Sequence, residues 1–177
     1  MEHPGELWQE ADYNGARIGD GLVPDACYDK PHKLLMGAAI MLYRFNNGDL
    51  EYLFQHRSKQ LIGNPDKWDT SAGGHVNINE PTLAAAVRET KEEINADIDP
   101  AKLEFFGRYL RGEIIVNLYF YNWTGNEDNF KFNDAEVEEV CWVKVKNLDD
   151  FWPNLKPHLA DDVVFKYLLD EHIKRVS

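Results

Sequence analysis

An acidic segment from Gly74 to Ala96, GHVNINEPTLAAAVRETKEEINA, constrains this chain more than any other stretch. Glu89, Glu92 and Glu93 are spaced i, i+3 and i+4, so their carboxylates share one face of a predicted helix. Three glutamates alone would fit a solvated acidic face, but a divalent cation would relieve their repulsion, and carboxylate oxygens suit Mg²⁺ or Mn²⁺. At about 100° per residue, a second, apolar stripe predicts the face toward the core, made of Leu83, Ala86, Val87, Thr90 and Ile94.

The spacing of the whole segment resembles the Nudix box, a glycine and a glutamate followed by an Arg-Glu-x-x-Glu-Glu run. Thr90 and Ala96 replace the usual aliphatic residues, and Asn95 replaces the last glycine of the motif. Asparagine tolerates the left-handed conformation that a helix C-cap often needs, so the last change is mild. The chain is therefore identified as a MutT-like member of the Nudix superfamily, of the subset resembling isopentenyl-diphosphate isomerase. The matching residues are Gly74, Glu80, Arg88, Glu89, Glu92 and Glu93.

The resemblance implies metal-dependent hydrolysis of a diphosphate bond in a nucleoside diphosphate linked to another moiety, or in a similar organic diphosphate. It implies Mg²⁺ or Mn²⁺ as cofactor, with Glu92 and Glu93 as central ligands and Glu89 as a ligand or general base. The backbone carbonyl of Gly74 is a further candidate ligand. Arg88 is expected to orient the glutamates through ion pairs, and Glu80 to hold the junction between loop and helix.

Further candidates lie outside the box. Relatives often carry a further carboxylate in a string like DAEVEEVCWV, which makes Glu136 and Glu139 the first choices, ahead of Glu138 and then Glu113. A solvated acidic strand end is the alternative for these residues. Phosphate contact is predicted for three basic residues of the loop after residue 56, for which ordinary surface charge is the alternative. These three residues are Arg57, Lys59 and Lys67.

Two other functions compete with hydrolysis. An isomerase of the isopentenyl-diphosphate type needs an acid–base cysteine before the box, but residues 71–73 read Ser-Ala-Gly and provide no thiol. His32 and His75 match histidines of that family, so they are either an accessory metal site or two hydrogen-bonded histidines near the core. The second alternative is a Nudix domain that only binds a nucleotide effector, but such domains usually lose the box glutamates that this chain keeps.

The pattern of strands and helices, together with the resemblance, predicts an α/β fold, an α/β/α sandwich with a mixed sheet. Residues 1–32 are expected to form an N-terminal hairpin extension, turning at Asn14-Gly15 and packed on the core, and residues 33–177 the Nudix domain. A central strand is predicted over 33–45, its partner over 50–57, and later strands over 103–110, 113–123 and 137–145. A final helix is predicted over about 161–174, with an apolar face of Val164, Leu168 and Ile173, joined by Val163 and Tyr167.

Composition limits the partners. A net charge of −12 argues against binding a nucleic-acid polymer through long-range attraction, but not against phosphate substrates, because a bound metal inverts the local field. No apolar run approaches membrane-spanning length, and Cys27 and Cys141 read as reduced thiols, so a cytoplasmic protein with a small-molecule diphosphate substrate is expected. A homodimer, with the N-terminal hairpin contributing to the interface, is a further hypothesis.

Overall fold

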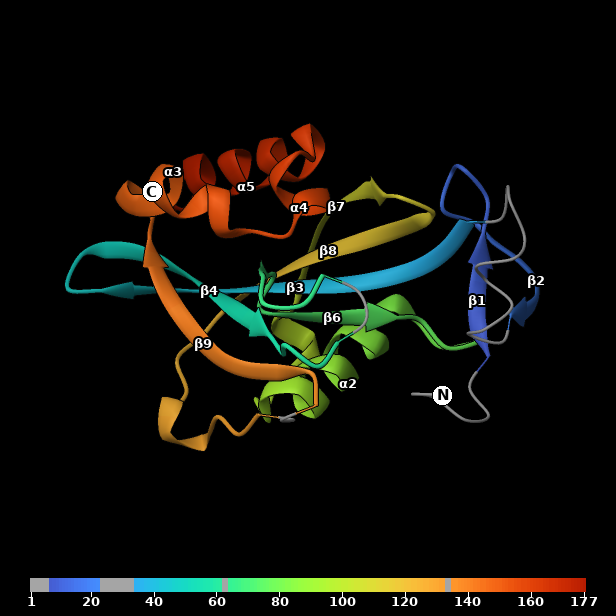
Figure 1. The fold of residues 1–177 in the computed structure, drawn as a ribbon, viewed down its shortest axis with the longest axis horizontal. Coiled ribbons are helices and arrows are strands. Elements are labelled where there is room, and N and C mark those ends of the chain that lie inside the picture. Colours follow the sequence, from blue (N-terminus) through green and yellow to red (C-terminus); the bar gives the residue numbers. More distant parts are fainter. Residues whose placement is uncertain (1–6, 23–33, 62–63, 133–134) are drawn as a thin grey trace.

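The computed structural model describes residues 7–22, 34–61, 64–132 and 135–177. In these residues one nine-stranded sheet forms the centre of the molecule, with helices on both of its faces (Figure 1). The strands are β1 (Trp8–Ala11), β2 (Arg17–Leu22), β3 (Leu34–Asn46), β4 (Asp49–Arg57), β5 (Trp68–Asp69), β6 (Ala72–His75), β7 (Glu104–Arg111), β8 (Ile114–Asn122) and β9 (Val137–Lys144). The α-helices are α2 (Thr82–Ile94), α3 (Leu148–Phe151), α4 (Pro157–Ala160) and α5 (Val163–Val176).

Strand β3 is the centre of the sheet, as its continuous apolar run predicted. It pairs in parallel with β8 from Leu35 to Tyr43, and antiparallel with β1, β4 and β6. Its first nine residues are all buried, because helices cover both faces of the sheet there. The presence of both parallel and antiparallel pairs confirms the predicted mixed sheet.

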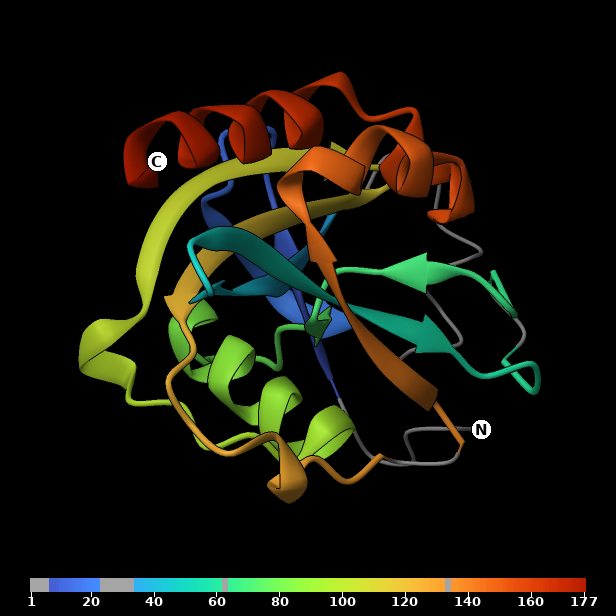
Figure 2. The ribbon, with the colours of Figure 1, turned by 90° about the vertical axis from the view of Figure 1, so that its left-hand side faces the viewer.

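Two hydrophobic cores lie on opposite faces of this sheet and confirm the predicted sandwich. One lies under α2 and includes Ile40, Leu53 and Ile94, and the other lies under α3, α4 and α5 and includes Phe54 and Phe165. Figure 2 shows the sheet between α2 on one side and α5 on the other. The acidic segment therefore lies on one face of the sheet only, the face under α2.

Helix α2 has the predicted buried stripe. Ala86, Thr90 and Ile94 are fully buried, and Leu83 and Val87 pack against the same core. The hydroxyl of Thr90 donates to the Ala86 carbonyl at 2.7 Å, which satisfies this polar group without disturbing the core. The helix ends at Asn95, which has a φ of 54°, so the predicted left-handed C-cap is confirmed.

The predicted apolar face of the last helix was wrong for three of its five residues, which are exposed: Val163, Val164 and Tyr167. The buried residues of α5 are Phe165, Leu169 and His172, whereas Val163 and Tyr167 remain 79% and 60% exposed. Residues at i, i+4 and i+7 share one helix face, so docking through Phe165 turns the aliphatic start of the helix outward. Asp162 caps the helix by accepting from the backbone N–H groups of residues 164 and 165. Of the residues predicted for this face, Leu168 and Ile173 are partly buried against the core and Val164 is exposed.

The predicted N-terminal hairpin consists of β1 and β2. Its turn follows Asp12, whose carboxylate accepts from the backbone N–H groups of Asn14 and Ala16, and Gly15 has a φ of 74°. Strand β1 pairs both with β2 and with the start of β3, so the hairpin extends the central sheet. Among the described residues, no helix has both the length and the apolar character needed to cross a membrane.

Candidate functional site

Two glycines of β6 allow close packing at the acidic segment, because Gly74 makes room for α2 and Gly73 makes room for β3. A Cβ atom on Gly74 would stand 2.4 Å from Oε1 of Glu89, and one on Gly73 would stand 2.7 Å from the Ala38 carbonyl oxygen. Real side chains do not approach this closely, so any larger residue would displace either the carboxylate or the neighbouring strand. Both glycines belong to strand β6, and the missing side chain of Gly74 makes room for Glu89.

Glu93 is the most deeply buried carboxylate of the box. It is 5% exposed, and its Oε2 accepts hydrogen bonds from the Gly73 backbone N–H at 2.9 Å and from Nε2 of Gln55 at 3.2 Å. Burial, followed by the charges of Glu89 and Glu136, raises its pKa well above the usual range. A bound cation would stabilise the charged form of this carboxylate.

Glu89 and Glu136 belong to the same acidic centre. Burial raises the pKa of Glu89 to about 7, Arg88 opposes this rise, and the charges of Glu92 and Glu136 add to it. Because the charge of Glu136 also acts on Glu93, this residue directly before β9 lies within electrostatic reach of both box carboxylates. The role of Glu136 as a metal ligand stays a prediction.

The other outside carboxylates have different surroundings. Oε1 of Glu139 lies 3.8 Å from Nδ1 of His56, and Glu138 accepts from the backbone N–H of Lys59 at 3.0 Å. Glu113 is exposed in the turn between β7 and β8. Their roles as metal ligands stay predictions.

Arg88 holds the box together, in the orienting role expected for it. Its Nε and Nη2 donate to the two carboxylate oxygens of Glu80, at 2.9 Å and 3.0 Å. Its Nη1 donates to Glu89 at 2.8 Å and to Glu92 at 3.0 Å, and Nη2 also donates to the carbonyl of His75 at 3.0 Å. Burial alone would raise the pKa of Glu80, but the hydrogen bonds from Arg88 and from the Asn77 N–H lower it overall.

The donor set fits a hard divalent cation. In the part of the chain that the structure describes, no three Asp, Glu, His or Cys side chains lie ready to hold a metal ion, and Arg88 pairs with Glu89 and Glu92. However, the buried Glu93 and the half-buried Glu89 both have raised pKa values and lie within electrostatic reach of Glu136, and oxygen ligands of this kind suit Mg²⁺ or Mn²⁺. Glu89, Glu92, Glu93 and Glu136, with the carbonyl of Gly74, would hold such an ion.

The three basic residues predicted to contact phosphate lie in or beside the loop between β4 and β5. Arg57 donates through Nε to the carbonyl of Asn64 at 3.2 Å, and its Nη1 lies 3.7 Å from Asp69. Lys59 is exposed and lies 3.8 Å from Asp66 and 3.9 Å from Glu138. Lys67 is exposed, and its backbone carbonyl accepts from the Arg57 N–H. Arg57 therefore supports this loop, while phosphate contact by the three residues stays a prediction.

The residues that distinguish an isomerase have structural roles here. Ser71 stands before the glycines and is completely buried; its hydroxyl donates to the Leu53 carbonyl at 2.5 Å and accepts from the Leu42 N–H at 2.8 Å. The ring of His75 stacks on Trp8, with centroids 3.6 Å apart and planes 4° apart. Its suggested partner His32 lies outside the described residues, so the accessory metal site stays a prediction.

Sequence reasoning missed two contributions to this site. The first is Gln55, whose polarity inside a buried strand was the available signal. The second is the N-terminal hairpin, since Arg17 donates to the carbonyl of Glu80 and the Gln9 N–H donates to the carbonyl of Val76 at 2.8 Å. The hairpin thus supports the loop between β6 and α2, and no local pattern indicated this contact.

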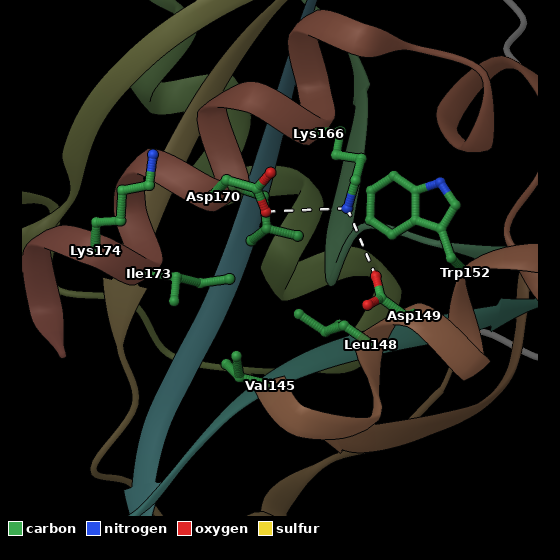
Figure 3. Close-up of a pocket in the computed structure, with 9 residues that line it drawn as sticks. Val145, Leu148, Asp149, Trp152, Lys166, Asp170, Ile173 and Lys174 are labelled. Carbon is green, nitrogen blue, oxygen red and sulfur yellow. Dashed lines mark ion pairs between the residues drawn. The ribbon is translucent and has the colours of Figure 1, made fainter.

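A cavity on the opposite face of the sheet contains none of the candidate residues. Its volume is about 280 Å³, and it lies between α3 and α5 (Figure 3). Lys166 stands 4.7 Å above the ring of Trp152 and lies 3.8 Å from Asp149 and 4.0 Å from Asp170. The second lysine of the cavity, Lys174, pairs with Glu171. Because carboxylates already pair with both lysines, the cavity is a poor phosphate site, and the acidic segment remains the candidate.

Comparisons with known proteins agree with this geometry. The sequence profile of the NUDIX domain matches residues 34–162. No curated protein sequence matches the chain. A protein of Deinococcus radiodurans has a similar structure, with a TM-score of 0.69 and 17% identity over 88% of this chain and 96% of that one.

Two further structures share the fold. The NUDIX domain of Shewanella oneidensis NrtR, solved with ADP ribose, has a TM-score of 0.63 and 14% identity, over 88% of this chain and all of that one. The Ap4A hydrolase of C. elegans has a TM-score of 0.55 and 23% identity, over 80% of this chain and 96% of that one. At these identities the likeness shows the fold, while the profile match covers most of the sequence. The chain therefore belongs to the NUDIX domain family, and the prediction of a Nudix hydrolase is confirmed at the level of family and fold.

Proposed function

We propose that this protein hydrolyses a diphosphate bond with the help of Mg²⁺ or Mn²⁺. One observation carries the proposal: α2 and β6 together hold Glu89 and Glu93 in a water-poor position within electrostatic reach of Glu136. Such an arrangement costs folding energy unless a cation joins it, so its presence favours a metal-dependent site. The cation would neutralise the diphosphate oxygens and acidify the attacking water.

Other groups of the chain hold the carboxylates in position. Arg88 orients Glu89 and Glu92 through Nη1, and its fork to Glu80 keeps the loop before α2 in register with the helix. Glu93 is held by the Gly73 N–H, which leaves its second oxygen available to a cation. Glu89 is a ligand or the proton acceptor.

The proposed substrate is a nucleoside diphosphate linked to another moiety, or a similar organic diphosphate. Two structural relatives support this class, since one was solved with ADP ribose and another is named as an Ap4A hydrolase. The loops 58–70 and 124–135 are the candidates for recognising the rest of the substrate. A cytoplasmic location, a homodimer and the division of the chain after residue 32 stay predictions.

A substrate panel tests the proposal. The protein, freed of metal with EDTA, is incubated with Mg²⁺ or Mn²⁺ and with nucleoside di- and triphosphates, dinucleoside polyphosphates, NDP-sugars, NADH, CoA and prenyl diphosphates. We expect hydrolysis of at least one diphosphate, lost in EDTA and restored by metal. Glu92→Gln should lower turnover by roughly two orders of magnitude or more while the domain stays folded. Glu171→Gln, which changes an exposed glutamate of α5, should leave turnover unchanged.

The same assay separates the alternatives. Interconversion of isopentenyl and dimethylallyl diphosphates without phosphate release would indicate an isomerase, although the buried Ser71 provides no thiol. Tight binding of one panel member without turnover would indicate an effector-binding domain, and the hydrolase proposal would then fail.

A further inference from the structure

Gln55 is a buried amide that lies directly beside the acidic centre. It belongs to β4, where Leu53 faces the core under α2 and Tyr52 and Phe54 face the opposite core. By this alternation Gln55 points to the side of α2, where its Nε2 donates to Oε2 of Glu93 at 3.2 Å. Gln55 is only 1% exposed, so its polar atoms must find their partners inside the protein.

Only one end of this amide is satisfied. Oε1 of Gln55 is buried and has no hydrogen-bond partner among the residues that the structure describes. The orientation of the amide follows from Glu93, because Oε2 already accepts from the Gly73 N–H and a flipped amide would place two oxygens against each other. An unsatisfied buried oxygen costs roughly 1–3 kcal/mol, so an apolar side chain of the same size would favour folding more. The amide is therefore better explained by a functional role at the acidic centre.

We propose that Gln55 is a positioning residue of the metal site. Its N–H group holds Glu93 in the orientation of a ligand, and its carbonyl oxygen accepts a hydrogen bond from a water in the hydration shell of the cation. Mg²⁺ keeps several waters in protein sites, and such waters need acceptors. A neutral oxygen serves this purpose without adding charge to a centre that already gathers Glu89, Glu93 and Glu136. This inference rests on the metal dependence proposed above.

Metal affinity, measured without substrate, tests the inference. Mn²⁺ is titrated by calorimetry into metal-free protein, and Gln55→Met is compared with the unaltered chain. Methionine has nearly the same size but neither donates to Glu93 nor offers a strong acceptor. Loss of a group that supports metal ligands typically weakens metal binding about 10–100-fold, and we expect a rise of this size in the Kd for Mn²⁺. The thermal midpoint of the metal-free variant should equal or exceed that of the unaltered protein.

Tyr52→Phe is the matched control, since it removes a buried hydrogen-bonding group from the same strand on the opposite face. Its Kd for Mn²⁺ should be unchanged. If Gln55→Met does not fold, Gln55→Asn keeps an amide on a stem too short to reach Glu93 and should weaken Mn²⁺ binding in the same way.

The outcomes separate this inference from the proposed function. Absence of Mn²⁺ binding by the unaltered protein would overturn both. Unaltered affinity in the Gln55 variant, or an equal loss in Tyr52→Phe, would overturn the role of Gln55 alone and leave metal-dependent hydrolysis standing.

Discussion

Arg88 donates to both carboxylate oxygens of Glu80, at 2.9 Å and 3.0 Å, and this fork joins the loop after β6 to helix α2. The same guanidinium also binds Glu89 and Glu92, so one side chain sets the direction of two proposed metal ligands. Arg17 donates to the carbonyl of Glu80 from the N-terminal hairpin and also supports this loop. The acidic face is therefore held by a connected set of ion pairs and hydrogen bonds.

Replacing Arg88 with lysine should separate charge from geometry. Lysine keeps the positive charge but cannot donate to Glu80 as a planar fork while also binding Glu89 and Glu92. We expect kcat/KM to fall by about 10–100-fold, as is typical when the groups that orient metal ligands are lost. Arg175→Lys, which alters an exposed ion pair with Glu104, is the control in the same kinetic assay. Unchanged kinetics for Arg88→Lys would contradict the orienting role.

The two glycines before the box should respond differently to alanine. In Gly74→Ala the new methyl group meets the flexible carboxylate of Glu89, which can swing away, so metal affinity should fall while stability changes little. In Gly73→Ala it meets the backbone of Ala38 and Ala39, so urea unfolding should show a loss of about 1–3 kcal/mol. Equal effects of both variants on stability and metal binding would speak against this division.

Removing one partner of the ion pair between Asp69 and Lys156 should destabilise the protein more than removing both. Both side chains are buried, and they link β5 to the segment before α4. Lys156→Met leaves Asp69 without its main partner, which should cost about 3–5 kcal/mol of unfolding free energy. The double variant Asp69→Asn/Lys156→Met removes both charges and should recover most of this loss. Urea unfolding of the single and double variants measures the difference, and an additive double variant would refute the coupling.

Acid should destabilise the protein through His172. This side chain is 0% exposed; burial, assisted by the charge of Arg175, lowers its pKa from 6.5 to about 4. Between pH 6.5 and 4, His172 is protonated in the unfolded chain but neutral in the folded chain. The free energy of unfolding is therefore unaffected by this group above pH 6.5 and falls as the pH drops through this window. The contribution of this one group is roughly 3 kcal/mol at most.

A double variant isolates this contribution. Nδ1 of His172 lies 2.6 Å from the hydroxyl of Tyr52, so Tyr52→Phe/His172→Phe removes both partners and leaves neither unpaired. Its urea unfolding free energy should fall less steeply between pH 6.5 and 4 than that of the unaltered protein. Parallel pH profiles would show that His172 does not carry the acid sensitivity.

The features set within a single helix or strand could be predicted from the residues alone. The spacing of Glu89, Glu92 and Glu93, the buried stripe of α2 and the C-cap at Asn95 follow from the geometry of one helix, which is set within a few residues. The continuous apolar run of β3 likewise identified the central strand, because a strand covered on both faces needs no polar alternation.

Contacts between residues far apart in the chain became known only from the folded structure. It brings Glu136 within electrostatic reach of Glu93, turns Gln55 toward Glu93, and brings Arg17 to the loop before α2. It also docks α5 through Phe165 and His172, where local hydrophobicity had favoured Val163 and Tyr167. The physical reason is that periodicity defines the faces of an element, whereas the partner of each face is chosen by packing among elements far apart in the chain.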